Sequence, residues 1–364
     1  MTGEDVTANI EVIRQAPKVV LHDHLDGGLR PTTVVELADE TGYDALPSRD
    51  PEVLADWFDQ GRDGGDLVGY LEAFTHTVAV MQTRDALERV AEECVEDLAA
   101  DGLVYAELRF APELHLRGGL PLEEVVEAVL EGFRRGSTRR AIEVRTLLVA
   151  MRDGHRSTEV AGLVTRYLDD GVVGFDIAGP EAGHPAAEHL AAFDRMHRSR
   201  GHVTIHAGEA AGLDSISEAL HAGRAERLGH GVRIVDDIRV GDDGQPRLGQ
   251  LAAEVRDRQV PLELCPTSNV HTGAARSIAQ HPFDLLRRLG FRVTVNTDNR
   301  LMSRITLSEE LARLAEAFGY GSASLEELTV AAMQSAFCEP EQRQRLVAQT
   351  IRPGWTTLFE EAPS

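Results

Sequence analysis

Four short motifs place metal-binding side chains at the ends of apolar, β-branched segments. The motifs are His22-Asp23-His24, His206-Ala207-Gly208-Glu209, Gly229-His230-Gly231 and Thr297-Asp298-Asn299. Together they supply three neutral nitrogen ligands and one carboxylate, besides a free glutamate and a spare histidine. This is the set of groups that a mononuclear zinc hydrolase needs. The sequence therefore predicts a hydrolase with one zinc ion per chain.

Each motif alone has a plainer explanation. His22 and His24 are two residues apart in an expected strand, so their rings point to one face, but such a pair can also be structural. Glu209 follows His206 across a glycine turn, so it can face the cavity without binding the metal, or it can stabilise the start of a helix. Asp298 alone would also suit a helix N-cap. The prediction therefore rests on the whole set.

Two further strands carry charged residues on one face. Glu107 and Arg109 share one face of an expected strand, and Glu263 and Cys265 share a face of another. Charges inside a barrel are costly unless they are paired or face a polar ligand. We therefore expect Glu263 to hold a ligand histidine or the surroundings of the free glutamate in place. His202, near the other end of its strand, is expected to be structural.

Eight strand-like segments alternate with helical patterns along the chain. They are the segments 18–24, 104–110, 143–151, 172–179, 202–208, 227–231, 260–266 and 292–298. This alternation predicts parallel strands, and eight repeats predict a closed (β/α)₈ barrel of the TIM type. The four motifs would then lie at the C-terminal rim, where barrel active sites form. An open doubly wound sheet is the alternative, but no G-x-G-x-x-G follows the first strand.

The stretch from 31 to 103 is too long for one crossover helix, so it predicts extra helices over the rim. Four apolar residues within it have helical spacing: Leu67, Tyr70, Leu71 and Phe74. They form either a buried helix face or a cover that contacts the substrate. From about Ser308 onward we expect helices packed on the barrel. No repeat or linker interrupts the chain, which predicts a single domain over residues 1–364.

Composition narrows the choice of partners. The chain has 37 Lys+Arg against 60 Asp+Glu, a formal charge of −23. Such a surface repels phosphate backbones and anionic lipid, which argues against nucleic acid and membranes as partners. A neutral or cationic small molecule is better suited to the negative electrostatic field of this surface. The apolar runs are too short to span a bilayer, and the N-terminus does not resemble a signal peptide.

Cysteine and lysine usage excludes other chemistries. The three cysteines, Cys94, Cys265 and Cys338, are widely spaced, which predicts a reducing cytoplasm and no disulfide framework. Zinc deaminases that use a P-C-x-x-C pair are excluded. Lys18 is the only lysine and begins the first strand, at the wrong end for barrel chemistry. Schiff-base and pyridoxal enzymes are therefore disfavoured.

The ordered motifs closely resemble the adenosine deaminase family. They are HDHLDG, GFDIAGPE, TIHAGE, RLGHG, LELCPTSN and VNTDN, and they cover roughly residues 17–300. The resemblance implies a (β/α)₈ barrel with one zinc ion and no organic cofactor. It also implies hydrolysis of the 6-amino group of adenosine or deoxyadenosine to give inosine or deoxyinosine and ammonia, a step of purine metabolism.

The resemblance implies a role for individual residues. Four resemble the zinc ligands: His22, His24, His206 and Asp298. Glu209 resembles the proton donor to purine N1, and His230 resembles the residue beside the attacking water. The backbone N–H of Gly179 resembles the contact to N3, and Asp26 the contact to the ribose 5′-hydroxyl. Glu209 needs a raised pKa, which a desolvated pocket provides. Asp298 and His230 are expected to orient the water and take its proton.

The chain departs from the family pattern after Asp298. Many members have a second aspartate where this chain has Asn299. Purine N7 is a hydrogen-bond acceptor and an amide donates at any pH, so we expect Asn299 to donate to N7. The segment 300–303 and Arg304 also differ from the family, and Arg304 contacts the substrate or is solvated.

Two other functions stay open at this point. The first is a deaminase of another 6-aminopurine compound, such as adenine, an aminated futalosine-type nucleoside or a specialised nucleoside. The second is a non-catalytic nucleoside-binding protein. The presence of Glu209 and of all four ligand residues argues against the second.

Overall fold

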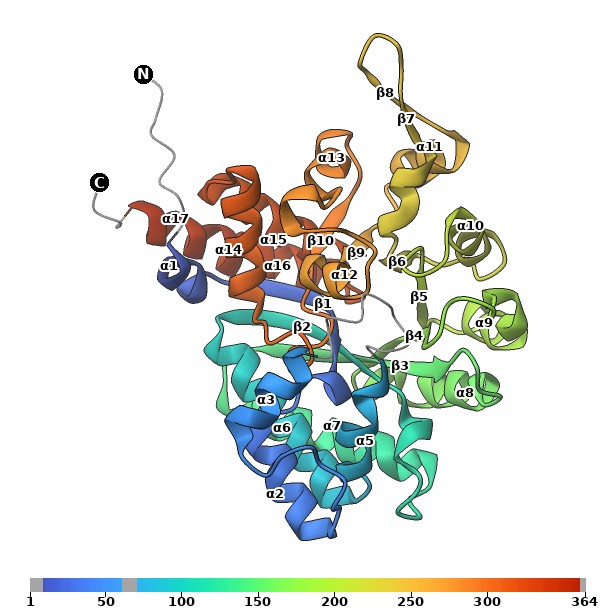
Figure 1. Cartoon of the computed structure of the whole chain (residues 1–364), viewed down its shortest axis with the longest axis vertical. Helices are drawn as coiled ribbons and strands as arrows, with labels where there is room; N and C mark the ends of the chain where they lie inside the picture. Colours follow the sequence, from blue (N-terminus) through green and yellow to red (C-terminus); the bar gives the residue numbers. More distant parts are fainter. Residues whose placement is uncertain (1–8, 61–70, 361–364) are drawn as a thin grey trace.

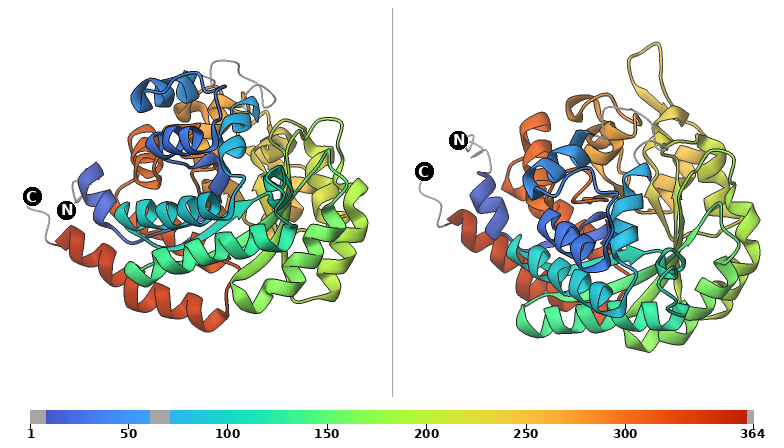
Figure 2. Two further views of the ribbon diagram at one scale, coloured as in Figure 1. Left: turned by 90° about the horizontal axis from the view of Figure 1, so that it is seen from below. Right: turned by 60° about the horizontal axis from the view of Figure 1, so that its bottom comes forward.

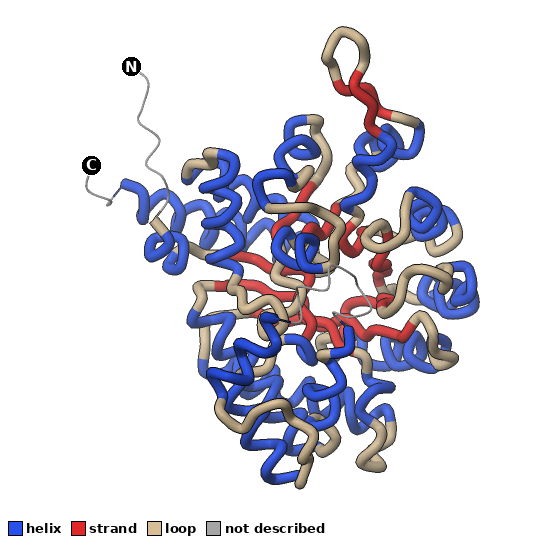
Figure 3. Tube along the Cα trace, viewed as in Figure 1, coloured by secondary structure: helices blue, strands red, loops and turns tan. Residues whose placement is uncertain are grey.

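The computed structural model describes residues 9–60 and 71–360. Eight parallel strands form a ring in the order β1-β2-β3-β4-β5-β6-β9-β10, surrounded by helices (Figures 1 and 3). Their bounds are β1 Lys18–His24, β2 Leu103–Phe110, β3 Glu143–Met151, β4 Val172–Ala178, β5 His202–Ala207, β6 Arg227–His230, β9 Leu262–Leu264 and β10 Val293–Val295. The predicted (β/α)₈ barrel is confirmed, and the open sheet is excluded.

The ring closes between β1 and the residues after β10. Asp23 and Asp298 form an isolated parallel bridge, in which the N–H of His24 donates to Asp298 O at 2.7 Å and the N–H of Asp298 donates to His22 O at 3.0 Å. The side chain of Asn296 extends the contact, because its Oδ1 accepts the N–H groups of both Leu21 and His22. The barrel is therefore closed at its C-terminal end.

Helices cover the outside of the ring. They include α6 Arg84–Ala100, α7 Leu122–Arg139, α8 Ser157–Tyr167, α9 Leu190–Arg198, α10 Leu213–His221, α11 Gln250–Asp257, α13 Phe283–Arg288 and α15 Ser322–Ser335. Their inward faces are apolar, as in α7, where Val125, Val126, Val129 and Phe133 are buried. Thr83 caps α6 by accepting the N–H of Ala86. The remaining C-terminal helices, α14 Leu307–Phe318, α16 Pro340–Leu346 and α17 Arg352–Glu360, pack at the same side as α1 Ile10–Gln15, so the predicted C-terminal helices are confirmed.

The long connection between β1 and β2 contains additional helices, as predicted. α2 (Pro31–Thr41), α3 (Pro51–Gln60) and α5 (Phe74–Val80) precede α6 and gather on one side of the molecule, where they are drawn in blue (Figure 2). α5 packs on the turn Leu25–Gly27 directly after β1. It therefore lies beside the C-terminal rim. The predicted residues Leu67 and Tyr70 lie outside the described part of the chain.

Two features differ from the sequence prediction. β7 (Ile238–Val240) and β8 (Pro246–Leu248) form an antiparallel hairpin that projects from the barrel, and strands this short carry too little pattern to be predicted (Figure 1). β9 is shorter than the predicted 260–266 because Pro266 begins helix α12 (Pro266–His271) and Cys265 is its N-cap. No helix within the described ranges is long and apolar enough to cross a membrane. All three cysteines are free.

Candidate active site

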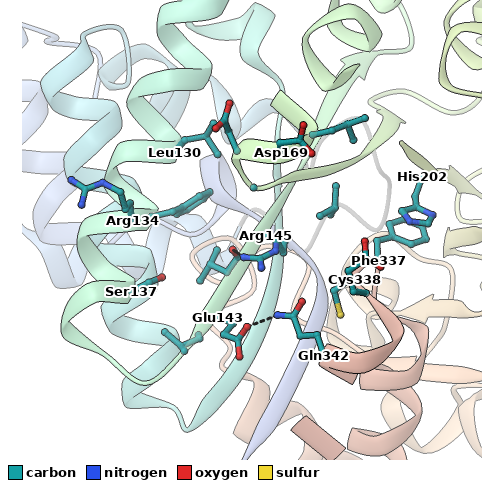
Figure 4. A pocket seen from close by; sticks show the side chains of 18 of the residues that line it. Leu130, Arg134, Ser137, Glu143, Arg145, Asp169, His202, Phe337, Cys338 and Gln342 are labelled. Carbon is teal, nitrogen blue, oxygen red and sulfur yellow. Dashed lines mark hydrogen bonds between the residues drawn. The ribbon is translucent and has the colours of Figure 1, made fainter. Parts of the chain in front are cut away.

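A cavity of about 300 Å³ opens at the C-terminal ends of the strands. Its wall includes five of the predicted metal and catalytic residues: His24, His206, Glu209, His230 and Asp298. A larger hollow of about 860 Å³ lies at the opposite ends of β3, β4 and β5 (Figure 4). His202 lines that second hollow, where its ring stacks on Phe337 and its Nδ1 lies 2.8 Å from a carboxylate oxygen of Glu226. His202 is therefore structural, as expected.

The four predicted metal ligands converge at one point. The Nε2 atoms of His24 and His206 are 3.2 Å apart, and Oδ1 of Asp298 is 3.2 Å from Nε2 of His22 and 3.5 Å from Nε2 of His24. All four ligand atoms lie within 4.8 Å of one another. Tetrahedral zinc with bonds of about 2.0–2.1 Å needs ligand atoms roughly 3.3 Å apart. Nε2 of His22 is buried and has no hydrogen-bond partner among the described residues, so the arrangement fits a metal ion.

Buried carboxylates orient two of these histidines. Nδ1 of His22 lies 2.9 Å from Glu263, and Nδ1 of His206 lies 2.9 Å from Asp176. Arg109 joins the two supports, because its guanidinium donates to Glu263 at 2.7 Å and to Asp176 at 2.6 Å. Glu263 accepts the Nδ1–H of His22, and Asp176 lies beside Nδ1 of His206, so both rings are turned with Nε2 toward the metal position.

Glu263 contacts His22, one of the predicted metal ligands, as the sequence suggested. Burial alone would raise its pKa, but the positive charges of Arg109 and Arg227 hold that pKa well below its usual range. Arg227 lies 2.6 Å from one oxygen of Glu263, and Thr204 donates to the same oxygen at 3.1 Å. Cys265 is a small buried side chain, and burial raises the pKa of its thiol well above the ordinary value.

Glu209 is 5% exposed and lies inside the cavity wall. Burial, and secondarily the charge of Asp298, raises the pKa of Glu209 well above its ordinary value. Its Oε1 accepts hydrogen bonds from Thr272 Oγ1 at 2.9 Å and from Asn269 Nδ2 at 3.4 Å. A raised pKa favours the protonated carboxylic acid, which is the form that has a proton to give.

The loop that carries Glu209 is held by another carboxylate, Glu181. Glu181 accepts backbone N–H groups from four successive residues, numbers 208 to 211, and the hydroxyl of Ser215. A ring of N–H donors of this kind is a strong anion-binding arrangement. Here the anion is the carboxylate of Glu181, and its contacts fix the direction in which the Glu209 side chain projects from the loop.

Asp298 and His230 both have left-handed backbone conformations, with φ of +59° and +60°. Non-glycine residues rarely adopt this conformation, and it concentrates at functional sites. Ser268 Oγ donates to Asp298 Oδ2 at 2.6 Å, and Asn269 Nδ2 lies 3.1 Å from His230 Nδ1. A side chain at Gly229 would lie 3.0 Å from the backbone of β5, so glycine at this position permits the close approach of β6 to β5.

The predicted substrate contacts within the described residues all line the cavity: Asp26, Leu71, Phe74, Gly179 and Asn299. Asp26 is buried, and its Oδ1 has no hydrogen-bond partner in the described part of the chain. Gly179 has φ of +107°, which only glycine adopts readily and which leaves its backbone open to the cavity. Leu71 and Phe74 are apolar parts of the cavity wall. Arg304 is half exposed and pairs with Glu52 and Asp56 of α3, so it is solvated.

Several supporting residues were not singled out from the sequence. Ser268, Asn269 and Thr272 reach the site from α12 and the turn after it. They belong to or follow the motif LELCPTSN, and the helical spacing of Ser268 and Thr272 would place both on one face. Asp176 shares the GFDIAGPE motif with Gly179, and only the strand order reveals its contact with His206.

The chain has close relatives among known proteins. A sequence model of the family described as adenosine deaminase matches residues 17–353. Adenosine deaminase 1 of Streptomyces coelicolor is 59% identical over 98% of this chain and 91% of the relative. Adenosine deaminase of Mycobacteroides abscessus is 57% identical over 97% of this chain and 100% of the relative. The solved structure of adenine deaminase from Arthrobacter aurescens has the same fold, with a TM-score of 0.81 and 24% identity over 95% of this chain and 99% of that one.

Proposed function

The chain belongs to the adenosine deaminase family, and from that premise we propose that it deaminates adenosine and deoxyadenosine at one zinc ion held by four residues. The ligands are His22, His24, His206 and Asp298. The products are inosine or deoxyinosine and ammonia. We propose that residues 1–364 form one catalytic domain and that the reaction belongs to purine metabolism in the cytoplasm.

The donor set suits zinc. Three imidazole nitrogens and one carboxylate oxygen are ligands that zinc accepts in catalytic sites. A zinc ion held by these residues would lower the pKa of water toward about 7 and so would supply a nucleophile at neutral pH. Glu263 and Asp176 turn the imidazoles of His22 and His206 so that Nε2 of each faces the metal position.

Glu209 supplies the proton that makes the purine reactive. Carbon 6 of a neutral purine resists attack by water, and protonation of N1 makes it electrophilic. The raised pKa of Glu209 keeps the proton available, and the cavity that it lines is the place where a purine base would lie. Asp298 and His230 flank the same space and orient the attacking water. The tetrahedral adduct then collapses with loss of ammonia.

The cavity wall suggests how adenosine is held. Asn299 lies next to the ligand Asp298 and donates its amide to N7, while the backbone N–H of Gly179 donates to N3. The unpartnered Oδ1 of Asp26 is an acceptor for the ribose 5′-hydroxyl. Leu71 and Phe74 cover the apolar faces of the nucleoside.

One observation carries the proposal. A buried glutamate whose pKa is raised faces the same cavity as four side chains whose ligand atoms converge on one point. This combination serves proton transfer and has no use in a protein that only binds nucleosides. The zinc-loaded protein should release ammonia from adenosine and deoxyadenosine. Binding of adenosine without ammonia release would contradict the proposal, and a clear preference for adenine or an aminated futalosine would redirect it to another 6-aminopurine.

A further inference from the structure

A chain of hydrogen bonds connects the backbone outside the cavity to both proton-carrying side chains inside it. It begins at the N–H of Phe283, which donates to Nδ1 of His281 at 3.1 Å. Nε2 of His281 lies 3.2 Å from Oδ1 of Asn269. Nδ2 of Asn269 then lies 3.1 Å from Nδ1 of His230 and 3.4 Å from Oε1 of Glu209. His281 and Asn269 are buried.

The first bond determines the orientation of all the others. A backbone N–H can only donate, so Nδ1 of His281 must carry a lone pair. The neutral ring therefore has its proton on Nε2 and donates to Asn269. Burial lowers the pKa of His281 to about 3, which keeps this ring neutral. The oxygen of the Asn269 amide must face His281, so the NH₂ group faces His230 and Glu209.

The two N–H groups of the Asn269 amide determine where His230 and Glu209 carry their protons. One amide N–H points to Nδ1 of His230, so that atom accepts and the proton of the neutral ring lies on Nε2. The other points to Oε1 of Glu209 at 3.4 Å, so that oxygen accepts and the proton of the carboxylic acid is assigned to Oε2. Nε2 of His230 and Oε2 of Glu209 lie 3.5 Å apart. Both residues line the cavity and present their protons there.

We propose that His281 and Asn269 are positioning residues that set the tautomer of His230 and the protonated oxygen of Glu209. The inference rests on the proposed function for its catalytic meaning, but the proton positions follow from the contacts among these buried, neutral side chains. His230, with its proton already on Nε2, donates a hydrogen bond to the reacting oxygen and does not take a proton from it at that atom. The proton of the attacking water then goes to Asp298. This revises the expectation that His230 takes part in accepting it.

Two substitutions of His281 separate this role from a packing role. Glutamine places its amide nitrogen near the position of Nε2 and can still donate to Asn269. Asparagine is shorter, and its amide oxygen can take the place of Nδ1 and accept the N–H of Phe283, but it does not reach Asn269. His281→Asn should therefore release the Asn269 amide and lower kcat by about 10–100-fold, the usual loss when a residue that orients an active-site group is removed. KM and zinc content should change little, and His281→Gln should recover most of the lost turnover.

The direct readout is the pair of ¹⁵N resonances of the His230 ring in zinc-loaded, ¹⁵N-histidine-labelled protein, assigned by loss of signal in His230→Gln. We expect Nε2 protonated and Nδ1 unprotonated in the parent and in His281→Gln, with that preference lost in His281→Asn. If His281→Asn does not fold, Asn269→Asp provides the test, since a carboxylate beside Nδ1 should move the proton there. A parent protein with the proton on Nδ1 would overturn the proposal. An unchanged His230 tautomer in both His281→Asn and Asn269→Asp would also overturn it. If the tautomer is as expected but adenosine is not deaminated, the proposed function fails and the proton placement stands.

Discussion

Asp23 and Asp298 form an isolated backbone bridge that closes the barrel, and the same bridge brings His22, His24 and Asp298 to one point. Three of the four proposed metal ligands therefore depend on the closure between the first and last strands. The side chain of Asp23 reinforces it: its Oδ2 accepts from Thr297 Oγ1 at 2.6 Å and from Arg300 Nε at 2.9 Å. The bridge couples the integrity of the fold to the integrity of the metal site.

Replacing Arg300, the cation that pairs with Asp23, should weaken zinc binding. Arg300→Met leaves the fully buried carboxylate of Asp23 without its ion pair, and breaking a buried pair typically costs about 3–5 kcal/mol. We expect faster zinc release to a chromophoric chelator and a lower melting temperature. Arg304→Met is the matched control, because Arg304 is half exposed and pairs only at the surface. Equal zinc release from the two variants would show that the Asp23–Arg300 pair does not support the site.

The metal ligands themselves can be tested by metal analysis. The purified protein should contain close to one zinc per chain, and His206→Ala should lose it because one of four ligands is gone. The readout is zinc content after dialysis, with His202→Ala as the control, since His202 lies on the same strand but at the opposite end of the barrel. Full zinc retention by His206→Ala would count heavily against the assignment.

The proposed metal ligands were predictable because each of them lies in a short, recognisable sequence pattern. A histidine pair with strand spacing, or an aspartate at the end of an alternating strand, can be read within a few residues, and the barrel then brings the strand ends together. The supports were not predictable in the same way. Arg109, Asp176 and Glu263 come from three strands, and their mutual contacts depend on the register. No local pattern in the sequence distinguishes His281 from other loop histidines, and only the packing around α12 gives it its partners.

The only lysine is expected to be structural. Lys18 is buried at the start of β1, where Nζ donates to the carbonyls of Ile13, Arg14 and Ala16. Lys18→Met would remove these three hydrogen bonds, at a cost of about 1–3 kcal/mol for each carbonyl that is left dry and without another donor. The free energy of unfolding should fall while kcat of the folded protein stays unchanged. A large loss of kcat in a fully folded variant would mean that the lysine has a role in the reaction.

The proposed contact of Asn299 is best tested on the substrate. A 7-deaza nucleoside has carbon in place of N7 and cannot accept the amide proton, which leaves a buried donor unpaired at a cost of about 1–3 kcal/mol. We expect kcat/KM to fall by about 5- to 150-fold, the equivalent of that free energy. Asn299→Ala should show a much smaller difference between the two substrates. An unchanged rate with the 7-deaza analogue would remove Asn299 from the binding site.

The most direct test of the whole account is the substitution Glu209→Gln. Glutamine keeps the shape of the side chain but has no proton to transfer, and general acid catalysis contributes about 10²- to 10⁴-fold. The variant should keep its zinc and its fold, and should bind adenosine nearly as well as the parent while losing nearly all ammonia release. Deamination within a few-fold of the parent rate would contradict the mechanism, and loss of zinc would make Glu209 a ligand and overturn the assignment of the metal site.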